Sequence, residues 1–315
     1  MMEAMKNGKT QVMPGDPSMR TKNNPRLSTR ANGEALRVLS EADWQFWLDN
    51  GYVIIKNAIS KQQAADSAAF VWDFEGKDPE DQQTWYKVAD THHKMLELNN
   101  SGMVEVYNNQ VLWNNRQSER IHQAFADVWG TDKLWVSIDR VNLNFPVKPG
   151  YEYTGFIHWD YDPETKPQYV QGVLALVDQT DEHMGGFQCI PELYRTYDTW
   201  KLSQPADRNR FKPDTTGFTT TKVKMEAGDL LIFNSSQPHG IRPNHSDKVR
   251  VAQYITMVPA DEENEELRSW RINAWHDRLA PDDDAYPGDP LQRERKYPIA
   301  ELSALGKKLL GLQKW

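Results

Sequence analysis

A mainly β fold, built as a sandwich or a barrel with helices at its flanks, is predicted by the second half of the chain. Beyond Gly130 the sequence changes to short apolar or alternating runs, which are typical of strands. Turn-forming residues separate these runs, and many short strands with such punctuation indicate a sandwich or a barrel rather than βαβ units. The predicted strands are 134–145, 169–177, 187–190, 219–225, 230–233 and 249–258.

A first helix is predicted directly after Ser40, whose side chain is a good cap for free backbone N–H groups. Trp44, Trp47 and Leu48 would fall on one face of this helix at helical spacing. The Asn-Gly pair at 50–51 is expected to end it, because glycine readily adopts the left-handed conformation found at helix C-termini.

Two more helices are expected before the strand-rich half. After a short strand over 52–55, a helix should run from Ser60, which forms a capping-box pattern with Gln63, toward Phe74. Another should start after Ser118 and turn three apolar side chains inward, namely Ile121, Phe125 and Val128.

The domain organisation is predicted to be simple. Residues 1–35 carry almost no periodic apolar pattern and many polar, glycine and proline residues, so we expect a mobile tail. Residues 36–315 should form a single domain, with the β-rich core at about 130–260 and a helical segment over 261–315. Leucines at near-helical spacing should pack that last segment back on the domain: Leu302, Leu305, Leu309, Leu310 and Leu312.

Composition limits the classes of partner. The formal net charge of −8 and the isoelectric point near 5.6 argue against nucleic acid or an anionic membrane surface. No run approaches the ~18–20 apolar residues that span a bilayer, and the N-terminus lacks the apolar core of a secretory signal. The single cysteine, Cys189, fits a reducing compartment and a place in the core. We expect a cytoplasmic protein that acts on a small molecule, with its oligomeric state left open.

The strongest chemical signal is His158-Trp159-Asp160 together with His239. Two imidazoles and one carboxylate are the protein ligands of a non-haem Fe(II) site, and they leave three metal positions open. Side chains two residues apart on a strand share a face, so His158 and Asp160 can converge on one ion. A second His-x-Asp, at 245–247, lies in a polar, proline-bearing stretch typical of a solvated turn, and we do not expect it to bind metal.

Three further residues are candidates for the same site. Arg250 follows His239 by eleven residues and is well placed to hold the far carboxylate of a keto-acid that chelates the iron, whereas Lys248 sits beside a turn and should be solvated. Asn142 and Asn144 alternate with apolar residues, so both amides should point to one face of a strand. If that face is the cavity, they contact the co-substrate or the substrate; otherwise they are surface residues.

With these features in order, the chain resembles the phytanoyl-CoA dioxygenase family of Fe(II)/2-oxoglutarate oxygenases over about residues 39–260. Several matches in the correct order are more specific than any one of them. The matching segments are 39–41, 49–55, 158–160, 174–178, 228–233, 239–240, 243–244 and Arg250.

The resemblance implies a double-stranded β-helix, a cupin-like jelly roll with flanking helices. It implies that His158, Asp160 and His239 ligate Fe(II), and that Arg250 pairs with the C5 carboxylate of 2-oxoglutarate. With O2, the co-substrate would be converted to succinate and CO2 while a small organic metabolite is hydroxylated, or else desaturated or cyclised. Halogenation is not expected, because halogenating relatives replace the ligand carboxylate with a small residue.

Two departures from the family pattern bear on the substrates. Pro191-Glu192-Leu193-Tyr194 stands where relatives commonly have Pro-Gly-Ser-His, which leaves the substrate open. Ile241 stands where a hydroxyl often follows the distal histidine, which removes one possible contact to 2-oxoglutarate. The alternative is a cupin-like metalloenzyme, an isomerase or a dioxygenase, that does not use 2-oxoglutarate; Arg250 argues against it. The intact triad argues against a binding module without activity.

Overall fold

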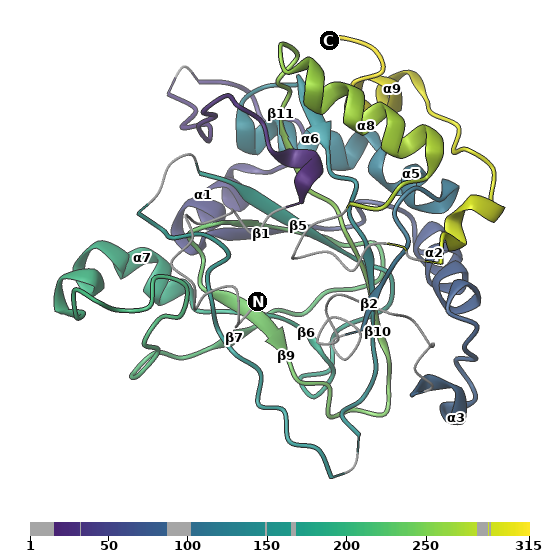
Figure 1. The fold of residues 1–315 in the computed structure, drawn as a ribbon. Coiled ribbons are helices and arrows are strands. Elements are labelled where there is room, and N and C mark those ends of the chain that lie inside the picture. The colour runs from purple at the N-terminus through teal and green to yellow at the C-terminus, as the bar shows by residue number, and fades with distance from the viewer. Residues whose placement is uncertain are drawn as a thin grey trace.

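The structure is a computed structural model that describes residues 16–31, 33–86, 102–148, 150–164, 168–281, 289 and 291–315. Its centre is a jelly roll of antiparallel strands, as expected (Figure 1). The larger sheet has six strands in the order β1-β8-β5-β10-β4-β2. These are β1 (Tyr52–Ile55), β8 (Leu230–Asn234), β5 (Val170–Ala175), β10 (Arg250–Tyr254), β4 (Val141–Asn144) and β2 (Met103–Val104).

Two smaller sheets complete the β-structure. One faces the larger sheet and has the order β7-β6-β9, with β7 (Thr221–Lys222), β6 (Gly186–Cys189) and β9 (His239–Arg242). The other pairs β11 (Met257–Pro259) with β3 (Leu134–Val136). The register places Ala252 of β10 opposite both Ala175 of β5 and Asn142 of β4, so these three side chains share one face.

That shared face is the inside of the jelly roll. Apolar residues from both facing sheets form one buried cluster there, and the rings of Phe187 and Phe233 lie 4.8 Å apart across it. Alternate residues point outward, so Leu174, Ile232 and Val251 belong instead to the main apolar core. The central strands β5, β8 and β10 are therefore largely buried on both of their faces.

Most of the helices cover the outer face of the larger sheet, and one, Pro191–Trp200, lies at the side of the jelly roll (Figure 1). Their bounds are α1 (Glu41–Asn50), α2 (Lys61–Phe74), α3 (Gln82–Trp85), α5 (Gln110–Arg116), α6 (Glu119–Trp129), α7 (Pro191–Trp200), α8 (Glu265–Asp277) and α9 (Ala304–Leu310). Short 3₁₀ helices span Pro17–Met19, Lys201–Ser203 and Arg293–Lys296. None of the helices in the described ranges combines the length and apolar character needed to cross a membrane.

The helix starts agree with the sequence pattern. Ser40 caps α1 by accepting a hydrogen bond from the backbone N–H of Asp43, and Gly51 ends the helix at φ 68°. Trp44 and Trp47 are buried, whereas Leu48, which shares their face by helical spacing, is 46% exposed. The face of this ten-residue helix that contacts the core is therefore narrower than its apolar pattern suggests.

The two later helices also begin where the sequence predicts. Ser60 caps α2 through the backbone N–H of Gln63, but the Gln63 side chain donates to Asn115 at 2.7 Å, so only half of the expected capping box forms. The three residues expected on the inner face of α6 are fully buried: Ile121, Phe125 and Val128.

Two of the predicted strands are interrupted. Run 134–145 divides into β3 and β4, and run 249–258 divides into β10 and β11. At the breaks, the backbone N–H of Thr256 donates to the Ser137 hydroxyl at 3.0 Å, while the N–H of Ser137 donates to the Thr256 carbonyl at 2.8 Å. A side-chain oxygen thus replaces one ladder acceptor, and the pair leaves the larger sheet to form a separate one.

Residues 1–35 were expected to form a mobile tail, and the described part of this segment makes specific contacts with the rest of the domain. The Ser18 hydroxyl accepts a hydrogen bond from the N–H of Ile138 at 2.8 Å, and its carbonyl accepts one from buried Arg271. Met19 is buried in the main core. Polar groups that need partners hold this segment in place, and apolar periodicity does not reveal such contacts. Residues 1–15 lie outside the described part.

The C-terminal segment packs back on the domain as expected. Leu309 and Leu310 of α9 are fully buried, and Leu302, Leu305 and Leu312 are partly buried against the main core.

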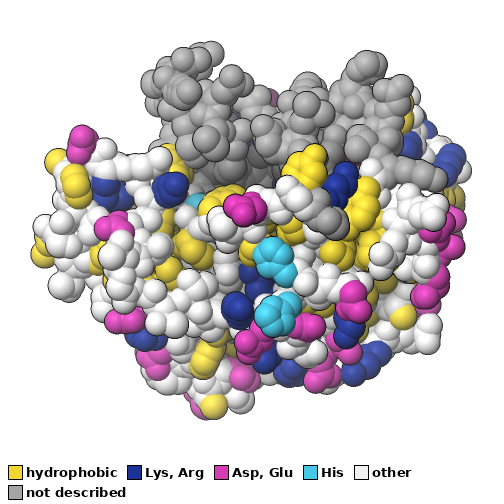
Figure 2. Space-filling model, turned by 90° about the horizontal axis from the view of Figure 1, so that it is seen from below, with side chains coloured by type: hydrophobic (Ala, Val, Ile, Leu, Met, Phe, Trp, Pro, Cys, Tyr) yellow, Lys and Arg dark blue, Asp and Glu magenta, His cyan; other side chains and the backbone are white. Residues whose placement is uncertain are grey.

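The face shown in Figure 2 carries acidic and basic side chains next to one another in its described part. The net charge of −8 is therefore not gathered into one patch on that face.

Candidate active site

His158 and His239 lie directly opposite each other on neighbouring backbone segments. The N–H of His158 donates to the carbonyl of His239 at 2.8 Å, and the reverse bond is 3.0 Å. This antiparallel bridge turns both imidazoles to the same side, with ring centroids 4.7 Å apart. Asp160 follows two residues after His158 and returns to that side, whereas Trp159 points away, is 1% exposed and packs on Trp200.

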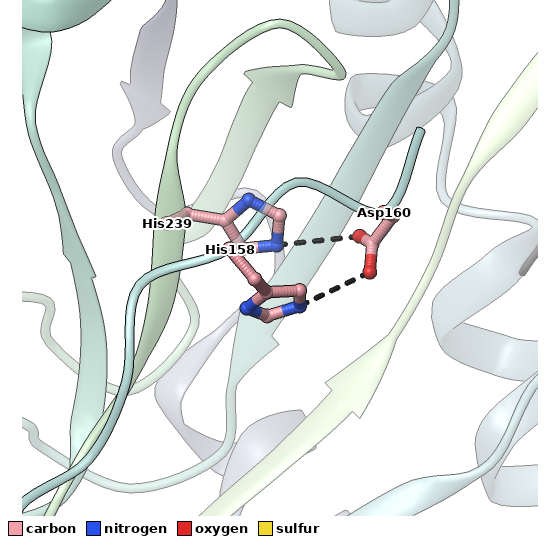
Figure 3. A group of neighbouring side chains, drawn as sticks. All are labelled: His158, Asp160 and His239. Carbon is pink, nitrogen blue, oxygen red and sulfur yellow. Dashed lines mark hydrogen bonds and ion pairs between the residues drawn. The ribbon is translucent and has the colours of Figure 1, made fainter. Parts of the chain in front are cut away.

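The three side chains converge as the sequence predicts (Figure 3). Nε2 of His158 lies 3.1 Å from Oδ1 of Asp160, and Nε2 of His239 lies 3.3 Å from Oδ2. Ligand atoms about 2.1 Å from a metal and at right angles to one another are about 3 Å apart. In the described part of the chain, this is the one group of three or more His, Cys, Asp or Glu side chains that could hold a metal ion.

The surroundings prepare His239 to act as a ligand. Its Nδ1 lies 3.0 Å from the carbonyl of Gln237. A carbonyl only accepts, so the proton resides on Nδ1 and the lone pair of Nε2 faces the Asp160 side. The rings of Phe233 and Phe187 lie 4.5 and 5.6 Å from the imidazole and form an apolar wall behind it.

Asp160 is held in its ionised form. Burial opposes ionisation, but the charges and hydrogen bonds of His239 and His158 outweigh it and hold the pKa of Asp160 well below its ordinary value. Gln171 also donates from Nε2 to Oδ2 of Asp160 at 2.6 Å. Sequence reasoning missed Gln171. The available signal was strand alternation on β5, which places Gln171 on the same face as the inward-facing Val173 and Ala175.

Arg250 stands at the start of β10 and is completely buried. Its Nε donates to Oε1 of Gln179 at 3.0 Å, and its Nη1 donates to Oδ1 of Asn142. Its Nη2 has no partner among the described residues, and the same holds for Nε2 of Gln179. No described carboxylate forms an ion pair with Arg250, so this buried cationic group and the Gln179 amide bonded to it each keep one donor nitrogen without a partner among the described residues.

The two asparagines lie on the face that holds Arg250. Asn142 is 2% exposed and binds Arg250 directly, and Asn144 is the register partner of Arg250 and is half-buried. Sequence reasoning missed Gln179, because the pattern places 178–186 in a turn. A glutamine amide at a turn has no signature in sequence until the fold brings it to the arginine.

Other basic residues near this part of the chain have structural roles or lie on the surface. Arg242 is buried and donates to four backbone carbonyls, those of Met184, Phe187, Val223 and Asp181. Burial, with the charge of Arg250, lowers its pKa to about 10. Lys248 and His245 are exposed, as expected of a solvated turn.

Cys189 is fully buried inside the jelly roll, and burial raises the pKa of its thiol. This agrees with the expected role as a small core residue.

A model of the family described as "Phytanoyl-CoA dioxygenase (PhyH)" matches residues 47–252, which include the triad and Arg250. The chain belongs to the phytanoyl-CoA dioxygenase family. This confirms the resemblance drawn from the motifs, and the match begins within α1 and ends within β10.

Individual relatives are distant. The chain is 25% identical over 233 residues to Ava biosynthesis cluster protein O from Aspergillus versicolor, a match that covers 66% of this chain and 74% of that protein. It is 22% identical over 315 residues to a Dictyostelium discoideum protein that bears the family's name, with 85% and 86% covered. A hypothetical protein from Escherichia coli has a similar fold, with a TM-score of 0.63, 17% identity and 90% and 87% covered.

Proposed function

We propose that this member of the phytanoyl-CoA dioxygenase family is an Fe(II)/2-oxoglutarate-dependent oxygenase that acts on a small organic molecule. The observation that carries the proposal is Arg250: a buried guanidinium with a donor that has no described partner, inside the same jelly roll as a His-Asp-His triad that could hold a metal ion. A buried charge costs several kcal/mol unless a partner compensates for it. A dicarboxylate bound between the triad and Arg250 would be that partner.

The proposed ligands of Fe(II) are His158, Asp160 and His239. Their nitrogen and oxygen donors suit this metal, and the set leaves three positions open. With 2-oxoglutarate and O2, bound Fe(II) supplies oxidation of an unactivated C–H bond, with release of succinate and CO2. The side chains of His158 and Asp160 are 20% and 15% exposed, so small molecules can reach the triad from one side.

The proposed anchor for the C5 carboxylate consists of Arg250 and Gln179. Nη2 of Arg250 and Nε2 of Gln179 are both buried donors, and a carboxylate oxygen could accept from each. Asn142 orients the guanidinium through Nη1. Ile241 removes the hydroxyl that often serves this end of the co-substrate, and the Gln179 amide supplies a donor in its place. Contact of Asn144 with the co-substrate or the substrate stays a prediction.

Hydroxylation is the proposed default reaction, with desaturation or cyclisation as the nearest variants. Asp160 supplies an anionic oxygen ligand at the position that halogenating relatives leave free for chloride. Mass analysis of the product formed under 18-O2 with excess chloride would distinguish these reactions. One labelled oxygen in the product is expected, and a chlorinated product would contradict the proposal.

Succinate release tests the function itself. Protein loaded with Fe(II) and 2-oxoglutarate without O2 is mixed with candidate substrates and then exposed to O2. Succinate should form in the wild type and not in Asp160→Ala, while His245→Ala should match the wild type. Metal-dependent turnover of a substrate without consumption of 2-oxoglutarate would instead support the cupin-like alternative.

A further inference from the structure

The two carboxylate oxygens of Asp160 have different surroundings. Oδ1 faces Nε2 of His158 at 3.1 Å. Oδ2 accepts a hydrogen bond from the Gln171 amide at 2.6 Å and lies 3.3 Å from Nε2 of His239. An amide nitrogen is a donor at every pH, whereas an imidazole Nε2 that faces a metal offers a lone pair. With a metal bound, the amide of Gln171 would therefore remain as the donor to Oδ2.

The position of Gln171 is unusual for its strand. β5 sends Gln171, Val173 and Ala175 to the inside of the jelly roll, and the latter two belong to the inner apolar cluster. Gln171 pairs in register with Phe233, whose ring packs against His239. Gln171 is the one polar side chain of this otherwise apolar row of three, it is only partly buried, and its amide is directed to the carboxylate of Asp160.

We propose that Gln171 is a positioning residue that holds Oδ2 of Asp160, so that the carboxylate meets the metal through Oδ1 alone. The inference rests on the proposed function. A carboxylate that binds through one oxygen takes one metal position, and with the two histidines it leaves three. Two of these are needed for 2-oxoglutarate and one for O2. Without Gln171, Oδ2 is free to turn to the metal and occupy one of the three.

The main test is Gln171→Met, which keeps the length of the side chain and removes the donor. Co(II) serves as the probe, because it has a visible spectrum that reports coordination. The variant should bind Co(II) about 10- to 100-fold more weakly than the wild type. At saturating Co(II) it should also bind 2-oxoglutarate at least about tenfold more weakly and give an altered visible spectrum.

Gln171→Asn separates a donor from a packing role. Asparagine keeps the amide but is shorter, whereas methionine keeps the size but not the amide. If Gln171 acts through its donor, Gln171→Asn retains more 2-oxoglutarate affinity than Gln171→Met. If Gln171 only fills space, the order is reversed, and that order would overturn the proposal.

Gln253→Met is the matched control. Gln253 is likewise a strand glutamine, but it is fully buried and faces α5, where it donates to the carbonyl of Leu112 at 3.1 Å and accepts from Asn115 at 2.8 Å. This variant should lose thermal stability and keep its affinity for Co(II) and 2-oxoglutarate. Equal affinities for both ligands in folded Gln171→Met and in the wild type would overturn the role of Gln171.

Failure of the proposed function would give a different set of binding results from failure of the positioning role. A wild type that binds Co(II) but not 2-oxoglutarate contradicts the oxygenase proposal, and the Co(II) affinity of Gln171→Met then decides the positioning role alone. A wild type that binds no metal contradicts both.

Discussion

Arg250 and Gln179 lie side by side inside the jelly roll, joined by a hydrogen bond of 3.0 Å from Nε of Arg250 to Oε1 of Gln179. Each keeps one further buried donor nitrogen without a partner in the described part of the chain. Buried donors are rarely left unpaired, because each costs about 1–3 kcal/mol. The pair is therefore a preformed place for an acceptor, and its charge favours an anion.

Arg250→Ala should weaken 2-oxoglutarate use without removing the metal. Loss of a charge-assisted hydrogen-bonded pair costs about 1.5–3 kcal/mol. This corresponds to a roughly 10- to 150-fold rise in the apparent KM for 2-oxoglutarate. Succinate release at varied 2-oxoglutarate measures it, with the exposed Lys248→Ala as control. An unchanged KM would mean that another basic residue holds the co-substrate.

Gln179→Ala should have a smaller effect of the same kind. It removes a neutral donor to the co-substrate and the acceptor that orients Arg250, at about 0.5–1.5 kcal/mol for each hydrogen bond. The KM for 2-oxoglutarate should rise several-fold, and metal affinity should not change. The exposed Gln62→Ala, on α2, is the control. A KM equal to that of the wild type would remove Gln179 from the anchor.

His239→Ala should abolish metal binding while the fold persists, because the imidazole lies at the inner surface of the jelly roll and the apolar cluster around it remains. Titration with Co(II) and thermal unfolding of the same sample measure the two effects. His245→Ala, on the exposed turn, should leave both unchanged. The reverse outcome, with metal lost only in the His245 variant, would show that the other His-x-Asp is the site.

Glu105 should make part of the stability depend on pH. Burial raises its pKa to about 7, with nearby Glu75 adding to the effect and Arg293 opposing it. Because the folded-state pKa lies above the unfolded value of about 4.3, this contribution is fully present below pH ~4 and is lost as pH rises toward 7.

Glu105→Gln should therefore flatten this part of the pH profile. The free energy of unfolding of the wild type, relative to that of the variant, should fall by about 1–3 kcal/mol between pH 4.5 and 7.5. Urea unfolding of both proteins at several pH values measures the difference. A constant difference across that range would show that Glu105 ionises as readily in the folded state as in the unfolded one.

The convergence of the candidate metal ligands could be predicted from sequence because strand alternation and family order act on short stretches. His158 and Asp160 share a face by spacing alone, and His239 and Arg250 follow from motif order. Gln171 and Gln179 could not be found in this way. Each acts through an amide that reaches a residue on another segment, Asp160 or Arg250, and only the folded sheet brings these groups together.

In the fold, too, features set by local interactions could be predicted and features set by long-range contacts could not. The helix starts after Ser40, Ser60 and Ser118 depend on local interactions and were predicted correctly. The docking of Ser18 on Ile138 and Arg271 depends on contacts across more than a hundred residues and leaves no periodic signal. The exposure of Leu48 likewise depends on what packs against α1.

The most direct test of the account is 2-oxoglutarate binding to Fe(II)-loaded protein without O2, followed by the absorption band of the metal–keto-acid chelate. The wild type should bind 2-oxoglutarate only when metal is present. Binding should be lost in His239→Ala and weakened roughly 10- to 150-fold in Arg250→Ala. Metal-loaded wild type that binds no 2-oxoglutarate, or binding that neither substitution changes, would contradict the proposed function.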